Sequence, residues 1–259
     1  MAPETLLAHF SEQHVAAFFL VLARISPLFL LAPLFSSKMI NGRVKGIAAV
    51  ALTVGIMPVA KHGEIDLNVL AYAGLIVKEI IVGLAFAYAL HAMFAAIQTA
   101  GTLIDTMIGL SFGAMVDPIT GTQSAVIQQM YSLFGVMVFV VIGGDAWVIK
   151  GFAKTYEAVP LLEAPAINSM VQGAQVAFST VFISAVMIAA PVVVAMIIVD
   201  AAFGVVTRVV PQMNVFAVGF PAKLIVGLTL IGASLPFVGG FVADQLQLSV
   251  AQAVAALGG

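Results

Sequence analysis

Long apolar runs alternate with short polar stretches along the whole chain. The runs cover residues 15–35, 44–60, 69–97, 125–149, 171–199 and 222–243. A helix needs about 20 apolar residues to cross the ~30 Å hydrocarbon core of a bilayer, so most of these runs are long enough to span one. The loops between them are short. The pattern predicts an all-α, multi-helix protein of the integral membrane type, organised as a single domain over residues 1–259.

The run at residues 171–199 is too long for one straight crossing. It contains no charged residue, and as a helix rising ~1.5 Å per residue it would be ~43 Å long. Such a segment must tilt, bend or leave the membrane plane. Prolines lie in or beside the apolar runs at Pro27, Pro33, Pro58, Pro191, Pro211, Pro221 and Pro236. Because each removes a backbone donor, and such breaks are tolerated at membrane depth only where protein or water covers them, we expect kinked or broken helices in an assembly.

The composition supports the bilayer as solvent. Hydrophobic residues make up 62% of the chain and charged residues 8%, against about 25% charged in soluble domains. The 10 basic and 12 acidic residues form no basic block, so we expect no nucleic-acid partner. The absence of cysteine excludes disulfides and thiolate chemistry. The start, MAPETLLAHFSEQH, lacks Lys and Arg, so we expect it to be mature protein rather than a signal peptide.

The pentapeptide GLSFG at residues 109–113 matches the G-x-S-x-G nucleophile elbow of serine hydrolases. That elbow needs a strand before the serine and an acid and then a histidine after it. The histidines, His9, His14, His62 and His91, all precede Ser111. We therefore expect Ser111 not to be a nucleophile and the protein not to be an enzyme. The sequence also has no H-E-x-x-H motif and no Walker loop, so we expect no catalytic residue, no metal site and no cofactor.

Several charged residues interrupt the apolar runs or stand at their edges: Arg24, Lys78, Glu79, Asp105, Asp145, Asp200 and Arg208. A charge at the centre of a bilayer costs about 2.5–3.5 kcal/mol on the insertion scale, so each should face protein or water. Either they form a proton relay or polar conduit, or they are structural pairs and snorkelling side chains. Lys78 and Glu79 are adjacent and point about 100° apart on a helix. We expect them to address different neighbours and not each other.

Three stretches carry a family pattern. FFLVLARISPLFLLAPLFSSKMINGRVKGIAAVALT (18–53) has an arginine, two spaced prolines and a basic loop. QTAGTLIDTMIGLSFGAMVDP (98–118) is an apolar loop that ends in Asp-Pro. RVVPQMNVFAVGFPAKLIVGL (208–228) is the most specific, through Pro211, Gln212, Asn214, Phe216, Gly219, Phe220 and Pro221. Together they resemble the FliR (R-type) family of type III export gate subunits over nearly the full length.

The resemblance implies an all-helical subunit that joins a P-type-like helical hairpin to a Q-type-like hairpin. In this family one R-type copy joins several P-type and Q-type copies (FliP and FliQ), with FlhB and FlhA nearby, in a helical assembly built largely above the membrane plane. The location implied is the bacterial inner membrane at the flagellar basal body, in contact with membrane lipid. The function implied is the gate through which unfolded flagellar proteins leave the cytoplasm.

The resemblance also assigns residues 107–122 to a plug loop that closes the channel. The bulky apolar residues are Met107, Leu110, Phe112, Met115 and Val116, the flexible ones are Gly109 and Gly113, and Asp117-Pro118 would end a helix. Asp105 stands where the family usually has a small residue. It would add negative charge to the lumen or pair with a neighbouring subunit. Ile40-Asn41 stand where members often carry a proline, which leaves that turn open.

Two other functions remain as alternatives. The equivalent subunit of a virulence-type injectisome gate would share most of these features. A secondary transporter for a small solute would also have broken helices and buried charges, but it should show two corresponding halves. No internal repeat is evident along this chain.

Overall fold

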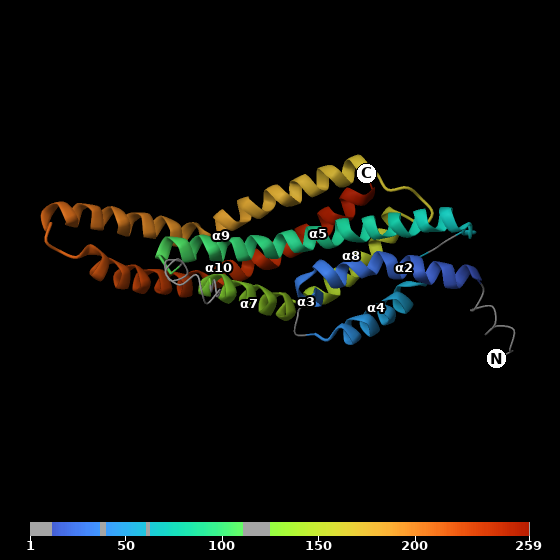
Figure 1. The fold of residues 1–259 in the computed structure, drawn as a ribbon, viewed down its shortest axis with the longest axis horizontal. Coiled ribbons are helices and arrows are strands. Elements are labelled where there is room, and N and C mark those ends of the chain that lie inside the picture. Colours follow the sequence, from blue (N-terminus) through green and yellow to red (C-terminus); the bar gives the residue numbers. More distant parts are fainter. Residues whose placement is uncertain (1–11, 37–39, 61–62, 111–124, 259) are drawn as a thin grey trace. The chain divides into compact units, whose positions relative to one another are not determined.

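The computed structural model of the chain describes residues 12–36, 40–60, 63–110 and 125–258. Every regular element in this part is helical, which confirms the all-α prediction (Figure 1). In chain order the helices are α2 (Glu12–Leu31), α3 (Pro33–Ser36), α4 (Gly42–Ile56), α5 (Val69–Ile108), α7 (Val126–Val141), α8 (Gly144–Ala158), α9 (Ile167–Val209) and α10 (Val215–Gly258).

Four of the described helices are long and apolar enough to cross a membrane: Glu12–Leu31, Val69–Ile108, Ile167–Val209 and Ala217–Gly258. Helices α5, α9 and α10 have 40, 43 and 44 residues, which corresponds to about 60–66 Å of length. That is about twice the hydrocarbon thickness of a bilayer. The over-long apolar run is therefore part of a still longer continuous helix.

The helices continue through some prolines and begin or end beside others: α3 begins at Pro33, α4 ends two residues before Pro58, and α9 ends two residues before Pro211. Pro27 lies inside α2, Pro191 inside α9, and Pro221 and Pro236 inside α10. One break without a proline falls at Gly143, between α7 and α8, where the backbone takes a left-handed φ of 68°. Glycine adopts this conformation without a steric penalty. The pattern of prolines did not indicate this position.

The chain divides into two compact units by its internal contacts. Unit 1 comprises Met1–Ala92, Gly143–Phe178 and Leu246–Gly259, and unit 2 comprises Met93–Ile142 and Ser179–Gln245. Helices α5, α9 and α10 contribute to both units. The single domain over residues 1–259 stays a prediction.

In unit 1, helices α2 and α4 lie side by side (Figure 1), and α2 meets α5 at a glycine. A Cβ atom on Gly83 would overlap the backbone carbonyl group of Arg24, so only glycine allows the two backbones to come this close. The ring of Phe86 packs edge-on against Phe152 of α8 with 5.5 Å between the centroids. These contacts bring α2, α5 and α8 together around the side chain of Arg24.

In unit 2, small residues let α5 approach its neighbours closely. A Cβ atom on Gly101 would lie 2.5 Å from Cα of Gln128 at the start of α7. Gly227 of α10 meets the side chain of Ile108 in the same way, since a Cβ atom there would lie 2.5 Å from its Cδ1 atom. The C-terminal end of α5 is therefore packed tightly between α7 and α10.

Candidate functional site

A buried polar cluster in unit 1 joins α2, α5 and α8. The side chain of Arg24 is fully buried and its Nε atom donates to Glu79, which is also fully buried. Nη1 donates to the carbonyl oxygen of Thr155 at 3.1 Å and Nη2 to that of Val159 at 2.9 Å. The guanidinium carbon lies 4.1 Å from the ring centroid of Tyr156. The positive charge thus meets the C-terminal end of α8, where the helix dipole favours a cation.

Lys78 extends this cluster beyond α8. Its Nζ atom donates to the carbonyl oxygens of Leu161 and Glu163, the latter at 3.0 Å. Nζ also lies 2.8 Å from Oε1 of Glu79. The expectation that these adjacent residues would not pair was wrong, because a four-carbon lysine side chain reaches back around the helix surface. Oε1 accepts no hydrogen bond from the described residues, so this contact is an ion pair without hydrogen-bond geometry.

The cluster is closed rather than open to a path. Two cations share one carboxylate and bond four backbone carbonyls, one in the last turn of α8 and three in the stretch that follows it. With Arg24 and Glu79 both at 0% exposure, the arrangement favours structural pairing over a polar conduit. The partners Thr155, Val159 and Tyr156 were not found from the sequence. Pro160 indicates that a helix ends before it, and the last carbonyls of a helix need donors. Nothing in the local sequence indicates that Arg24 supplies one.

Asp105 occupies a different place from both sequence-based expectations. Its side chain is 1% exposed, and its Oδ1 and Oδ2 atoms accept hydrogen bonds from the backbone amides of Ile127 at 3.1 Å and Gln128 at 3.0 Å. The expectation of lumenal charge or of pairing with a neighbouring subunit is therefore corrected. Both carboxylate oxygens therefore accept hydrogen bonds within the chain, at the N-terminal end of α7, where the helix dipole is positive.

The remaining charged candidates lie nearer the surface. Asp200 of α9 pairs with Lys223 of α10 at 2.5 Å and is half exposed, and the same lysine lies 3.5 Å from the carbonyl oxygen of Met107. Arg208 is exposed in the last turn of α9, and Asp145 is exposed in the first turn of α8. Both have the sign that the local helix dipole favours.

Only the beginning of the predicted plug is among the described residues. Met107 is half-buried in the last turn of α5, Gly109 takes a left-handed φ of 93° just after the helix ends, and Leu110 is half-buried. The other members of the set lie outside the described residues: Ser111, Phe112, Gly113, Met115, Val116, Asp117 and Pro118. The predicted loop therefore starts at a glycine whose backbone conformation ends α5.

The family motif forms the turn between α9 and α10. Pro211 and Gln212 are exposed, and the side-chain oxygen of Asn214 accepts from the amide of Ala217 at 3.2 Å, so it caps α10. Phe216 lies in the first turn of α10. Further along that helix, Gly219 is buried against Phe203, Phe220 is half-buried and Pro221 is exposed. One residue of the motif, Asn214, therefore has a local role at the start of α10.

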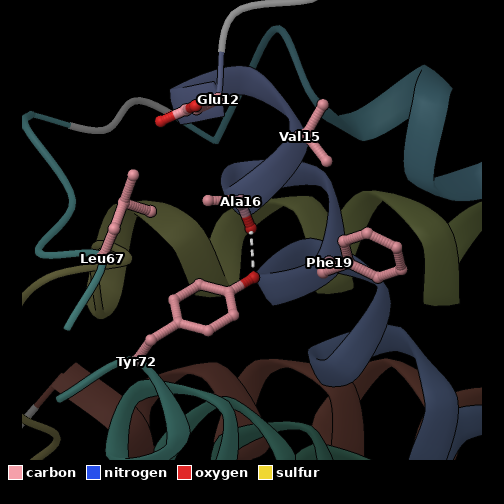
Figure 2. Close-up of a pocket in the computed structure, with 6 residues that line it drawn as sticks. All are labelled: Glu12, Val15, Ala16, Phe19, Leu67 and Tyr72. Atoms are coloured by element: carbon pink, nitrogen blue, oxygen red, sulfur yellow. Dashed lines mark hydrogen bonds between the residues drawn. The ribbon is translucent and has the colours of Figure 1, made fainter. Parts of the chain in front are cut away.

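A shallow apolar groove beside the start of α2 was not predicted. Figure 2 shows it lined by Glu12, Val15, Ala16, Phe19, Leu67 and Tyr72, with a volume of about 340 Å³. The hydroxyl group of Tyr72 donates to the carbonyl oxygen of Ala16 at 2.9 Å. Elsewhere in the described ranges, no group of three His, Asp or Glu side chains is placed to hold a metal ion.

Comparison with known proteins identifies the family. Residues 15–249 match the family described as bacterial export proteins, family 1. The chain belongs to this family. The flagellar biosynthetic protein FliR of Pectobacterium carotovorum subsp. carotovorum is 30% identical over 227 residues, which are 88% of this chain and 87% of that protein. FliR of Escherichia coli (strain K12) is 28% identical over 86% of each chain.

The surface presentation of antigens protein SpaR of Shigella sonnei is 25% identical over 82% of each chain. The matched range of this bacterial export protein contains the Arg24 cluster, Asp105 and the turn between α9 and α10. Its buried charges therefore belong to the part of the chain that the family shares.

Proposed function

We propose that this chain is a core subunit of the flagellar type III protein export gate. With P-type and Q-type subunits (FliP and FliQ) it would form the channel through which unfolded flagellar proteins leave the cytoplasm. The proposed location is the bacterial inner membrane at the flagellar basal body, with FlhB and FlhA nearby. The observation that carries this proposal is the match of residues 15–249 to the bacterial export family, together with relatives named flagellar biosynthetic protein FliR.

The surface of α9 supports an assembly with other subunits. Its 43 residues correspond to about 65 Å measured along the helix, which is about twice the hydrocarbon core of a bilayer. Large apolar side chains on it are exposed, among them Ile183 at 58%, Val186 at 60% and Ile198 at 64%. Lipid can cover only part of such a helix. The rest needs protein, since contiguous exposed apolar surface marks interaction sites.

Co-purification tests the assembly. The tagged chain, co-expressed with P-type and Q-type subunits and extracted in mild detergent, should hold both through size-exclusion chromatography. A variant with Ile183→Glu and Ile198→Glu on the exposed face of α9 should lose them, because a buried unpaired carboxylate is costly. Elution of the unmodified tagged chain without either the P-type or the Q-type subunit would contradict the proposal.

We propose further that residues 107–122 form the plug of this channel. A channel wide enough for an unfolded chain would leak ions unless it is filled, and a hydrophobic constriction can exclude ions by dewetting. The segment combines bulky apolar residues with a flexible start at Gly109. Deletion of residues 110–116 should leave assembly intact and make cells sensitive to sodium and to a small antibiotic. An assembled deletion variant whose membranes stay tight would rule out the plug.

The match to SpaR supports a second candidate, the equivalent subunit of a virulence-type injectisome gate. Complementation separates the two. Expression in a strain that lacks its own FliR should restore motility if the chain serves a flagellum. Restoration of injectisome secretion without motility would favour the second candidate.

A further inference from the structure

We propose that Asp105 is a positioning residue that holds the two ends of the segment 109–124 together. The proposal rests on the proposed function only where the segment is taken as a plug. The hydrogen bonds by which Asp105 links α5 to α7, called the tie below, involve only described residues of unit 2. Asp105 is neither exposed nor paired with a cation among those residues, with 1% of its surface accessible. Its bonds instead join the last turn of α5 to the first turn of α7.

Asp105 contacts both ends of the segment at once. Its backbone carbonyl oxygen accepts hydrogen bonds from the amides of Gly109 and Leu110, both at 3.1 Å, where the segment begins. Its carboxylate accepts from the amides of Ile127 and Gln128, at 3.1 and 3.0 Å, where the segment has ended. One residue therefore sets the separation between the point of departure and the point of return.

Helix α7 depends on this carboxylate because it lacks a cap of its own. Its N-cap residue is Ala125, which makes no side-chain capping hydrogen bond. The first amides of a helix have no intrahelical acceptor and carry partial positive charge. Asp105 supplies the missing acceptor from another helix. A capping side chain at position 125 would satisfy the amides of α7 equally well. Because the acceptor comes from α5 instead, it also links the two helices.

The close approach of the backbones makes the short side chain sufficient. One turn before Asp105, a Cβ atom on Gly101 would lie 2.5 Å from Cα and 3.0 Å from N of Gln128. Helix α5 therefore touches the start of α7 at backbone distance. At that distance aspartate reaches two successive amides. Asparagine offers only one oxygen, and its amide group would face an N–H donor.

Spin labels at the two ends test the tie directly. The chain contains no cysteine, and Thr106 and Gln129 are exposed on either side of it. Nitroxides at Thr106→Cys and Gln129→Cys, in the full chain assembled with its co-expressed partners, should give one narrow distance distribution. In Asp105→Ala the population with separated ends should rise about tenfold or more, because two charge-assisted hydrogen bonds are lost.

A matched pair of second-site changes separates a tie from a simple helix cap. Asp105→Ala with Ala125→Asp restores a local cap to α7 but not the link to α5, so its distance distribution should stay broad. Asp105→Cys with Gln128→Cys restores the link between α5 and α7 without the cap. The two cysteines are joined by oxidation or by a short bis-methanethiosulfonate linker, and the readout is membrane leakage. This variant should be tight when closed and leaky after reduction.

Each outcome bears on one claim. A narrow distribution in Asp105→Ala, or its full recovery in Asp105→Ala with Ala125→Asp, would overturn the tie. If the distribution broadens and the deletion of residues 110–116 leaks, but Asp105→Ala does not leak, the tie exists without positioning the plug and the proposal fails at that step. If the deletion does not leak, the plug is wrong while the distance result still decides the tie.

Discussion

Replacement of Arg24 by methionine should strongly destabilise unit 1. The change leaves Glu79, at 0% exposure, with Lys78 as its remaining ion-pair partner and removes the donor to the carbonyl oxygen of Val159, 2.9 Å away. The carbonyl oxygen of Thr155 loses less, since it still accepts from the amide of Val159 at 2.9 Å. Breaking a buried pair by removing one partner costs about 3–5 kcal/mol of the free energy of unfolding.

The double variant distinguishes an ion pair from a mere loss of packing. Glu79→Leu alone leaves a buried cation and should also cost about 3–5 kcal/mol. Arg24→Met with Glu79→Leu removes the buried pair and leaves one unpaired carbonyl, a loss of about 1–3 kcal/mol. Lys78 loses its carboxylate but keeps two carbonyl acceptors and partial exposure. The double variant should therefore be far more stable than the sum of the two single changes, which is the signature of direct coupling.

Unfolding of the full chain by SDS in mixed micelles measures these differences. Trp147 is the only tryptophan and lies in α8, whose C-terminal end binds Arg24. Asp145→Asn, at an exposed position of the same helix, serves as control and should change stability by less than about 1 kcal/mol. Additive single and double changes, or a loss of less than about 1 kcal/mol in Arg24→Met, would refute the assignment of Arg24 as the centre of the cluster.

Two further predictions concern single residues. Gly83→Ala should destabilise the chain by about 1–3 kcal/mol or more, because the added methyl group overlaps the backbone of Arg24. Gly74→Ala, with open space around it in the same helix, should be neutral or slightly stabilising in the same SDS titration. Equal losses of stability in both variants would contradict the close approach of α5 to α2. Ser111→Ala should leave swimming motility intact in a complementation assay, because no histidine follows Ser111 in the chain; lost motility with a normally assembled gate would give Ser111 a role that we do not expect.

Helix type and the membrane class follow from the sequence because both depend on local properties. Apolar runs of bilayer length, with 8% charged residues, leave helices as one of few ways to pair the backbone in lipid. The expectation that charges inside these runs face protein is also local, since it depends on the cost of burial alone. It holds for Arg24, Glu79 and Asp105, all buried with partners.

Which groups pair depends on packing between distant segments, and local patterns carry no information about it. Arg24 meets α8 across 135 residues, and Asp105 meets α7 across 23. Gly83 lets α5 approach the backbone of Arg24, where Glu79 of the same helix pairs with it, and Gly101 lets α5 approach the start of α7. A glycine alone does not indicate which helix comes near. The sequence by itself determined that these charges need partners. Only the tertiary structure decided that the partners are helix ends, because the free carbonyls and amides there become neighbours only after the helices have packed.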